Sequence, residues 1–386
     1  MKNFIFLMKR EFSFFWSNKI LRLLFIGAPI MYGILLGYVY EKGKVTDLSI
    51  IVVDEDHSNM SNKAIQMFDD NEVINVSQIK YDPLKVTDAT IEDGAACVVM
   101  IPKNFEADIL LKKYPEVTIF VNTSNILTAN YASSAIQLCL GTLRAGIEIE
   151  TLKKQGVPES IAATQYEPFR MSFIKKYNRS TNYMYFLWPG VLATILQQVL
   201  LLALALSFAS EYENNTFKDL VQKAPSTFKL IAVKIIPYMI MSFGIWLLYA
   251  LFAWWFRVPL NTHMWDLTLV AGIFVLAVSC IGIVVSILIP NQLKATEVLM
   301  VIATPSFIIS GFTWPLSQMP GWIQTIADCI PLTHFLKIFR VLVVEGGSLS
   351  QVSDSIWAMI IIGLVCGFTA YIALHFKIKK TLRTIK

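Results

Sequence analysis

The sequence predicts a helical membrane protein with six transmembrane helices and an α/β domain inserted between the first and the second. Hydrophobic residues make up 55% of the 386 residues, charged residues make up 16%, and the mean hydropathy is +0.55. A soluble chain of this length carries more charge. The apolar residues gather in six uncharged runs: residues 23–40, 183–210, 235–256, 267–292, 298–327 and 355–376. Each run has about the 20 residues that a helix needs to cross a bilayer core, where backbone polar groups must pair internally.

The charged residues predict how the chain is oriented in the membrane. Residues 1–22 contain five Lys or Arg and one Glu, and residues 377–386 contain five Lys or Arg and no acid. Residues 41–184 contain fifteen basic and nineteen acidic residues. Because cytoplasmic segments carry an excess of Lys and Arg, we expect both termini in the cytoplasm and the long loop outside. The basic ends are then topology signals, and we expect no nucleic-acid partner.

On this basis the chain divides into five parts. We expect an interfacial amphipathic helix at residues 1–19, the first span at 20–40 and an extracytoplasmic domain at 41–182. Spans two to six then occupy residues 183–376, and a cytoplasmic basic tail occupies 377–386. The first helix places its apolar residues on one face, as helices in the headgroup region do. A plain extension of the first span is the alternative.

The extracytoplasmic segment reads as a folded domain, because strand and helix patterns alternate along it. Strands are expected at 48–53, 73–76, 95–101 and 117–121, and helices at 61–70, 83–93, 105–113 and 126–155. This order is typical of a small α/β layer structure. Asp54, Glu55 and Asp56 are either a cation site or solvated turn residues. The residues leave open whether Cys97 and Cys139 form a disulfide or stay as buried free thiols.

The sequence shows no catalytic constellation and no Cys/His spacing typical of a metal site. It contains no Ser nucleophile elbow and no phosphate-binding loop. The nearest fragment is Gly43-Lys44, but Val45 follows where Ser or Thr is required. We therefore expect no enzyme and no cofactor in this chain. If nucleotide drives the protein, another chain must hold it.

The loop between spans two and three, residues 210–225, has the pattern of a short amphipathic helix. Acidic residues open it, an apolar stripe of Phe217, Leu220 and Val221 follows, and Pro225 ends it. Such a helix on the cytoplasmic side either docks in the groove of a partner or lies on the membrane surface.

A few polar residues inside the spans are candidates for a translocation path. Gln197 and Gln198 lie in the middle of an apolar run, where amides need partners. They either join two helices or contact a substrate. Glu297 follows Lys294 by three residues, so an i,i+3 pair explains it as well as a gating role does.

The fifth apolar run is broken by prolines at 305, 315, 320 and 331. We expect the chain to leave regular helix after Gly311 and to form an outer re-entrant segment at 312–345. Broken backbone at membrane depth is tolerated only where protein or water covers it. An outer gate is expected here, and its candidates are Ser310, Gly311, Pro315 and Phe335. Two GxxxG motifs, at 33–37 and 363–367, are expected to pack helices within one subunit.

Three groups of residues, in the same order along the chain, resemble the ABC-2 type transporter permeases. The first resembles the coupling-helix segment of that family and comprises Glu211, Glu213, Thr216, Phe217, Leu220, Pro225 and Lys234, with Asn215 where glycine is common. The second resembles span five and the outer re-entrant segment, and runs from Pro305 through Pro315, Met319, Pro320 and Trp322 to Phe335. The third lies in the outer domain, at 53–56, 101–105 and 122–125. The resemblance covers essentially the whole chain.

The resemblance implies the permease subunit of an exporter with the ABC-2 type fold, in a bacterial inner membrane. A separate ABC ATPase subunit would hold ATP and Mg, and a second permease would complete a homodimer or a paralogous heterodimer. A periplasmic adaptor protein is a further expected partner besides the lipid membrane.

Within this family, residues 4–16 resemble the connecting helix, and six residues would couple to the ATPase. Glu211 and Glu213 would engage basic groups of the ATPase, while Phe217 and Leu220 fill its groove beside Thr216 and Val221.

The apolar spans suit hydrophobic or amphiphilic cargo. Two other classes are the alternatives. One is a membrane-anchored envelope scaffold or binding protein that does not transport. The other is an ion-driven carrier, against which the scarcity of mid-membrane charges argues.

Overall fold

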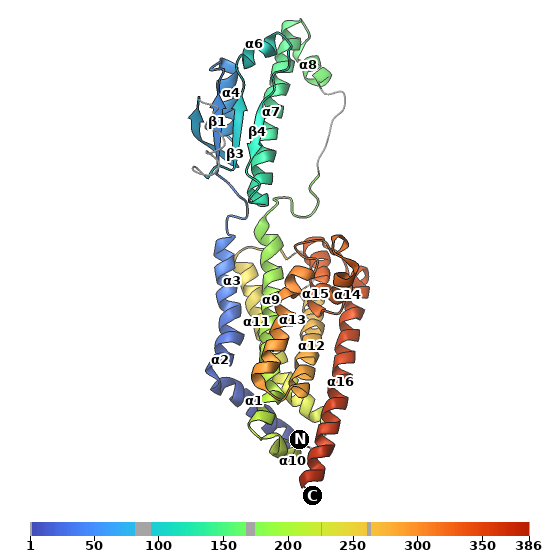
Figure 1. The fold of residues 1–386 in the computed structure, drawn as a ribbon. Coiled ribbons are helices and arrows are strands. Elements are labelled where there is room, and N and C mark those ends of the chain that lie inside the picture. Colours follow the sequence, from blue (N-terminus) through green and yellow to red (C-terminus); the bar gives the residue numbers. More distant parts are fainter. Residues whose placement is uncertain (1, 82–93, 167–173, 225, 261–263, 386) are drawn as a thin grey trace. The chain divides into compact units, whose positions relative to one another are not determined.

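Within the residues that the structure describes, six helices are long and apolar enough to cross a membrane, and each contains one of the apolar runs or its first part. The structure is a computed structural model that describes residues 2–81, 94–166, 174–224, 226–260 and 264–385. It divides into two units, Met1–Gly43 with Lys175–Lys386 and Lys44–Ile174. We call the first the spanning unit and the second the α/β unit, and describe each by itself (Figure 1).

The spanning unit begins with two helical segments separated by a break. Helix α1 covers Lys2–Ser17, and the first span follows as α2 (Lys19–Arg22), a π-helical turn η1 (Leu23–Gly27) and α3 (Ala28–Val39). Asn18 has an extended backbone, and its side-chain oxygen accepts hydrogen bonds from Ile20 N and Leu21 N, both at 3.1 Å. This cap starts a new helix. The residues before it therefore form a separate helix rather than an extension of the span.

The remaining spans are α9 (Tyr183–Glu213), α11 (Thr227–Trp255), α12 (Met264–Leu288), α13 (Gln292–Ile309) and α16 (Ser353–Ile385). A short helix, α10 (Phe217–Lys223), lies between α9 and α11. Between α13 and α16 come η3 (Leu316–Gln318), α14 (Gly321–Asp328), α15 (Pro331–Phe339), η4 (Arg340–Val344) and η5 (Leu349–Val352). The end of this unit that holds α10 and the C-terminus is called the α10 end (Figure 1).

Two details of the spans differ from expectation. The residues from 377 do not leave the last helix, because Ile378 is still buried and α16 continues to Ile385. On α13, Lys294 and Glu297 are both exposed, and no ion pair joins them in the described part of the chain. The expected break after α13 is confirmed, since Gly311 has a left-handed backbone (φ +78°) that favours glycine.

Both GxxxG motifs pack within the subunit. A Cβ on Gly33 would come within 2.6 Å of the Phe252 ring, and one on Gly37 would overlap the Phe256 ring. The second motif lies against α12, where Gly363 faces Ala277 at ordinary contact distance. The first motif therefore brings α3 close to the end of α11.

Replacing Gly37 with valine should displace Phe256 and separate α3 from α11. Inserting side-chain atoms into a packed site destabilises by about 1–3 kcal/mol. Thermal unfolding in detergent measures this cost. Gly363→Val, whose nearest neighbour leaves 3.4 Å, is the matched control and should cost less. Equal losses in the two variants would contradict the packing described here.

The α/β unit contains a four-stranded sheet of β1 (Leu48–Asp54), β2 (Ile74–Lys80), β3 (Cys97–Ile101) and β4 (Thr118–Val121). The strand order is β2-β1-β3-β4, and among these described strands the β1–β2 and β1–β3 pairs are parallel and the β3–β4 pair is antiparallel. The helices are α4 (Asn59–Asp69), α6 (Phe105–Leu110), α7 (Ile126–Lys154) and α8 (Glu159–Tyr166). Residues of α4 and α7 share one core with the sheet, including Phe68 and Ile136. The four expected strands and three of the expected helices are present, α8 was not expected, and the helix expected at 83–93 lies outside the described residues.

Asp54, the last residue of β1, and Asp56 just after it accept hydrogen bonds from the turn and from the starts of α4 and α6. Asp54 is buried and accepts hydrogen bonds from Asp56 N (3.0 Å), His57 N (3.2 Å) and the Ser61 hydroxyl (2.9 Å). Asp56 accepts one from Glu106 N at 3.0 Å. These contacts fit the turn interpretation. No metal-binding group of His, Cys, Asp and Glu occurs within the described residues.

Cys97 and Cys139 are both free thiols in this structure. Cys97 lies in β3 and is fully buried, and burial raises the pKa of its thiol to about 11. Burial also raises the pKa of Cys139 on α7. Thiols with raised pKa values are poor nucleophiles at neutral pH, so both act as core residues.

Candidate functional site

The α10 end of the spanning unit contains four charged side chains that pair with one another. Lys234 Nζ on α11 lies 2.8 Å from Glu211 Oε1, at the end of α9, and 2.8 Å from Glu11 Oε1 on α1. Arg10 Nη2 lies 2.8 Å from Glu211 Oε2. The relative exposures of Lys234, Glu11 and Glu211 are 2%, 3% and 4%. We call Arg10, Glu11, Glu211 and Lys234 the ion cluster.

The ion cluster joins three helices and the turn that starts a fourth. Glu211 is its centre, because it binds α11 through one oxygen and α1 through the other. Thr216 occupies the N-cap position of α10, and its hydroxyl donates to Glu211 Oε2 instead of capping the helix. Two acids and two bases balance in charge, as buried ions must. The cluster therefore fixes how α10 sits on α1, α9 and α11.

The turn between α9 and α10 depends on one unusual residue. Asn215 has a left-handed backbone (φ +59°), a region that glycine adopts freely and asparagine tolerates. Thr216 N then bonds to Glu211 O at 3.0 Å, which closes the turn. The position where the family commonly has glycine is thus compatible with asparagine here.

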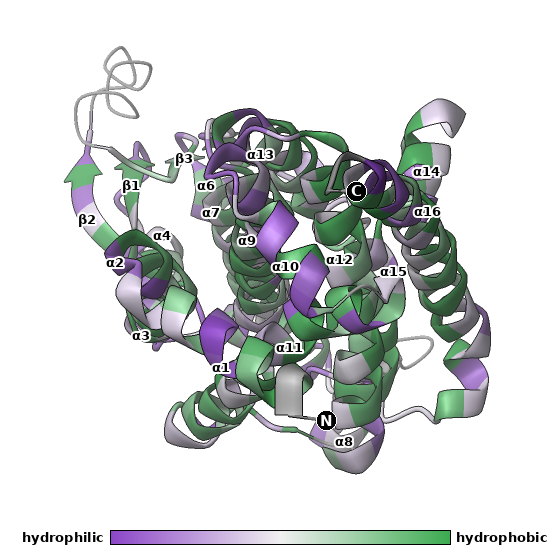
Figure 2. Cartoon of the chain, turned by 90° about the horizontal axis from the view of Figure 1, so that it is seen from below, coloured by the Kyte–Doolittle hydropathy of each residue, from purple (hydrophilic) through white to green (hydrophobic). Residues whose placement is uncertain are grey.

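Helix α10 turns its apolar stripe inward, which differs from expectation. Phe217, Leu220 and Val221 are buried in the core of their own unit, and the Phe217 ring lies 4.7 Å from that of Tyr212. These side chains are therefore not available to fill a partner's groove. The exposed residues of α10 are Lys218, Asp219, Gln222 and Lys223, and Figure 2 shows hydrophilic residues on α10 over the mainly hydrophobic spans.

The two acids expected to engage the ATPase have partners within the subunit. Glu211 is held in the ion cluster. Glu213 is exposed, and its Oε2 accepts hydrogen bonds from Gln292 Nε2 (2.8 Å) and Gln292 N (3.3 Å) at the start of α13. These acids therefore join helices of the same chain, because both lie where the ends of several spans meet.

A second connection reaches α16. Lys377 Nζ donates to the Ile287 carbonyl at the end of α12, and it lies 4.1 Å from the centre of the Tyr212 ring. Tyr212 in turn contacts Phe217 of α10. The chain α10–Tyr212–Lys377 links the short helix to α12 and α16. No local pattern predicts this link, because in the sequence Lys377 is only the first residue of a basic tail.

The polar candidates within the spans separate into an inter-helix contact and an exposed acid near the start of α13. Gln197 is buried, and its Nε2 donates to Ser306 Oγ on α13 at 3.0 Å. This favours the helix-joining interpretation for Gln197, while Gln198 is half-buried beside it. Glu297 is exposed on the same helix as Ser306. The structure does not bring Gln197 and Glu297 together.

Two of the outer-gate candidates, Ser310 and Gly311, form one turn, and the other two, Pro315 and Phe335, lie outside it. Ser310 Oγ donates to Phe307 O at 2.6 Å and accepts from Phe312 N at 3.3 Å around Gly311. Arg340 Nη2 donates to Phe312 O at 2.8 Å, which ties the turn to η4. Pro315 is exposed beyond this turn. Arg340 lies in the expected re-entrant segment, residues 312–345, but nothing in the sequence pattern predicts this contact.

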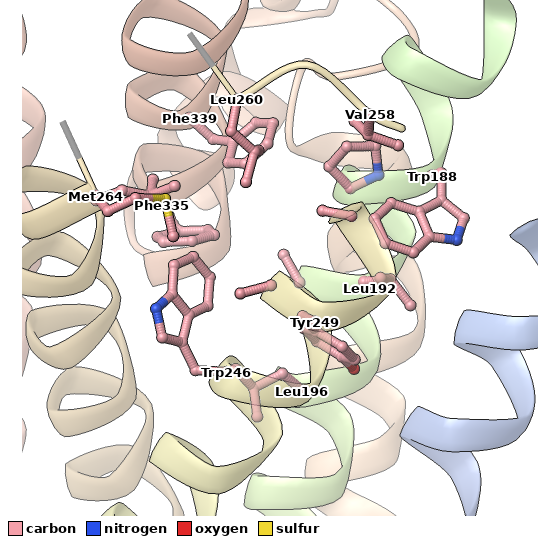
Figure 3. A pocket seen from close by; sticks show the side chains of 15 residues that line it. Trp188, Leu192, Leu196, Trp246, Tyr249, Val258, Leu260, Met264, Phe335 and Phe339 are labelled. Atoms are coloured by element: carbon pink, nitrogen blue, oxygen red, sulfur yellow. The ribbon is translucent and has the colours of Figure 1, made fainter. Parts of the chain in front are cut away.

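Phe335 lies elsewhere, in the wall of an apolar pocket between α9, α11, α12 and α15 (Figure 3). It stacks on Phe274 of α12, with ring centres 4.4 Å apart. The pocket is lined by Trp188, Pro189, Leu192, Ala193, Leu196, Trp246, Tyr249, Ala250, Ala253, Val258, Leu260, Met264, Leu267, Phe335 and Phe339. None of these residues is charged.

The sequence was also compared with known families and proteins. The family described as ABC-2 family transporter protein matches residues 19–372, which is most of the chain. The chain belongs to this family. It is a membrane-embedded, multi-pass permease subunit and not a catalytic enzyme, and the family generally implies an ATPase partner and dimerisation.

Two curated Escherichia coli K12 proteins match along nearly their whole length. The protein named "Probable multidrug ABC transporter permease YbhR" is 21% identical over 351 residues, which cover 91% of this chain and 92% of that protein. "Inner membrane transport permease YhhJ" is 20% identical over 358 residues, 90% of each. "Probable multidrug ABC transporter permease YbhS" is 26% identical over a shorter match of 172 residues, 44% of this chain and 46% of that protein.

Proposed function

We propose that this chain is the permease half of an exporter in which a separate ATPase moves the spans by pushing on α10. The observation that carries this proposal is the attachment of α10. Its apolar stripe is buried in the spanning unit, and its first residues are tied to the ion cluster. A helix held so firmly on one side and polar on the other is suited to receive force from a docked partner.

The contact surface for the ATPase in this proposal is the exposed face of α10. It consists of Lys218, Asp219, Gln222 and Lys223. The Lys223 ammonium lies 5.1 Å from the Phe6 ring of α1, so α1 borders this face. Charged contacts of this kind set partner choice and orientation. The partner would thus meet polar groups, and the apolar stripe would transmit the movement inward.

Two routes would carry the movement from α10 into the spans. The ion cluster leads to α1, α9 and α11. The contacts of Tyr212 and Lys377 lead to α12 and α16. Because tightly packed elements shift as units rather than deform gradually, a small tilt of α10 would reorient whole helices.

The proposal includes an orientation and an assembly. Both termini and α10 lie in the cytoplasm, and the α/β unit lies outside a bacterial inner membrane, as the distribution of Lys and Arg favours. ATP and Mg are bound by the ATPase. A second permease completes the transporter, and the α/β unit is available to a periplasmic adaptor.

The apolar pocket and the multidrug names of two relatives support an apolar or amphiphilic substrate.

Reversing the charge pattern on α10 tests the contact with the ATPase. The double variant Lys218→Glu with Asp219→Lys keeps the net charge and the buried stripe. We expect about tenfold less ATPase to co-purify with it, a change equivalent to about 1.4 kcal/mol. The measurement is the ATPase-to-permease ratio after affinity purification of the tagged permease from detergent.

The matched control is the same kind of swap in the α/β unit. Lys153 and Glu159 form an exposed pair there at 3.2 Å, so Lys153→Glu with Glu159→Lys should leave the ratio unchanged. Full retention of the ATPase by the α10 variant would contradict the contact surface. A wild-type chain that retains no ATPase would support the anchored scaffold instead.

A further inference from the structure

We infer that the pocket between α9, α11, α12 and α15 is a binding site, within a single subunit, for an uncharged aromatic molecule. Five of its lining residues are aromatic: Trp188, Trp246, Tyr249, Phe335 and Phe339. Figure 3 shows Trp188 and Trp246 on opposite sides of the cavity, with Phe339 and Leu260 at one end and Leu196 at the other. The claim that a transported substrate binds in this pocket rests on the proposed function. The claim that the pocket binds an uncharged aromatic molecule does not.

The two indole rings are held so that they offer only carbon and π surface. Trp188 Nε1 donates to the Gly33 carbonyl of α3 at 3.0 Å, and Trp246 Nε1 donates to Thr268 Oγ1 of α12 at 3.2 Å. Because both N–H groups already donate hydrogen bonds within the protein, neither needs an acceptor atom from a ligand. A charged ligand would lose its hydration without compensation here.

Two of the aromatic walls are backed by rings outside the pocket. Phe335 stacks on Phe274 with an interplanar angle of 22°, and the Trp188 ring lies 6.2 Å from that of Phe256. Side chains fixed by their neighbours lose little freedom when a ligand binds. Aromatic faces on opposite walls favour a flat ring system over an alkyl chain, since ring–ring contacts add to the burial of apolar area.

The pocket has a buried floor and an exposed rim. Trp188, Leu192 and Phe335 are each 2% exposed, whereas Met264 is 41% exposed. The rim lies where α12 begins, at the end of the spanning unit away from α10 (Figure 1). The described residues on this side of the pocket, Leu260 and Met264, are apolar, so an uncharged molecule would meet no charged group among them.

Photolabelling with benzophenone tests this site. The full-length permease is placed in lipid nanodiscs without the ATPase, irradiated, and digested for mass spectrometry. We expect labelling on Met264 and other lining residues. Unlabelled naphthalene should suppress that labelling, while dodecane at the same concentration should not. Labelling at lipid-facing Leu364, which is exposed on α16, should not respond to either competitor.

Filling the pocket gives an independent check. Ala250→Phe, on α11, should lower the labelling of Met264 by about tenfold or more. The new phenyl ring would fill the cavity and leave no room for benzophenone. Leu269→Phe adds a ring at an exposed position of α12 and should change nothing. The competition experiment needs no variant, so it decides the question if Ala250→Phe folds poorly.

Three results would overturn the inference. Equal suppression by dodecane would show that the pocket takes alkyl chains. Labelling of Met264 no stronger than that of Leu364 would show that no site exists. Unchanged labelling in a folded Ala250→Phe protein would place the ligand elsewhere. Since the ATPase is absent, these outcomes are separate from any failure of the coupling proposal.

Discussion

Replacing Lys234 with methionine is expected to destabilise the α10 end of the spanning unit by about 3–5 kcal/mol, the cost of breaking a buried ion pair by removing one partner. The substitution leaves Glu11 and Glu211 buried without the ammonium that each contacts at 2.8 Å. Arg10 compensates only in part, since it lies 4.0 Å from Glu11. Thermal or denaturant unfolding in detergent, followed by near-ultraviolet circular dichroism, measures the loss.

Neutralising the acids in the same protein should restore most of that stability. Replacing a whole buried ion group with neutral residues of similar volume is often without cost. We therefore expect Lys234→Met with Glu11→Gln and Glu211→Gln to be more stable than Lys234→Met alone. If Lys234→Met alone lowers the free energy of unfolding by less than about 1 kcal/mol, the value typical of exposed ion pairs, the ion cluster is not buried from solvent as described.

Replacing Phe15 with alanine is expected to detach α1 from the spans. The Phe15 ring is fully buried and meets Phe25 and Tyr238 edge-on, with ring centres 5.6 Å and 6.3 Å apart. Removing a buried phenylalanine costs about 3–5 kcal/mol. Under the proposed function, the variant should also bind the ATPase but show weaker stimulation of ATP hydrolysis by transported substrate, because α1 is one of the transmitting helices.

The adjacent residue is the matched control. Trp16 is 53% exposed, so Trp16→Ala removes an aromatic ring of larger size at the surface and should change stability by less than about 1 kcal/mol. Similar losses for Phe15→Ala and Trp16→Ala would mean that α1 is held mainly by its outer face.

Much of the fold could be predicted because its signals are local. The uncharged runs identify all six spans, and the alternation of strand and helix patterns identifies the four strands of the α/β unit. The break at Asn18 and the turn at Gly311 also have local causes. The basic residues from 377 predict where the apolar run ends. They do not show that the helix itself continues to Ile385 with Ile378 still buried.

The site was harder to predict, because its contacts join distant parts of the chain. Glu11, Glu211 and Lys234 come from three helices, and their pairing leaves no mark in the spacing of residues. The amphipathic pattern of α10 predicted an apolar stripe correctly. It could not tell whether that stripe faces a partner or its own subunit, since both arrangements give the same periodicity.

The central claim is that α10 is a cytoplasmic handle on which the ATPase pushes, and thiol labelling tests it most directly. Gln222 is exposed on α10, so Gln222→Cys should react with a membrane-impermeant maleimide, in a protein whose exposed Cys329 is replaced by serine. The account predicts labelling in inverted membrane vesicles, protection by the bound ATPase, and no labelling in right-side-out vesicles. Labelling of Gln222→Cys from outside intact cells would contradict it.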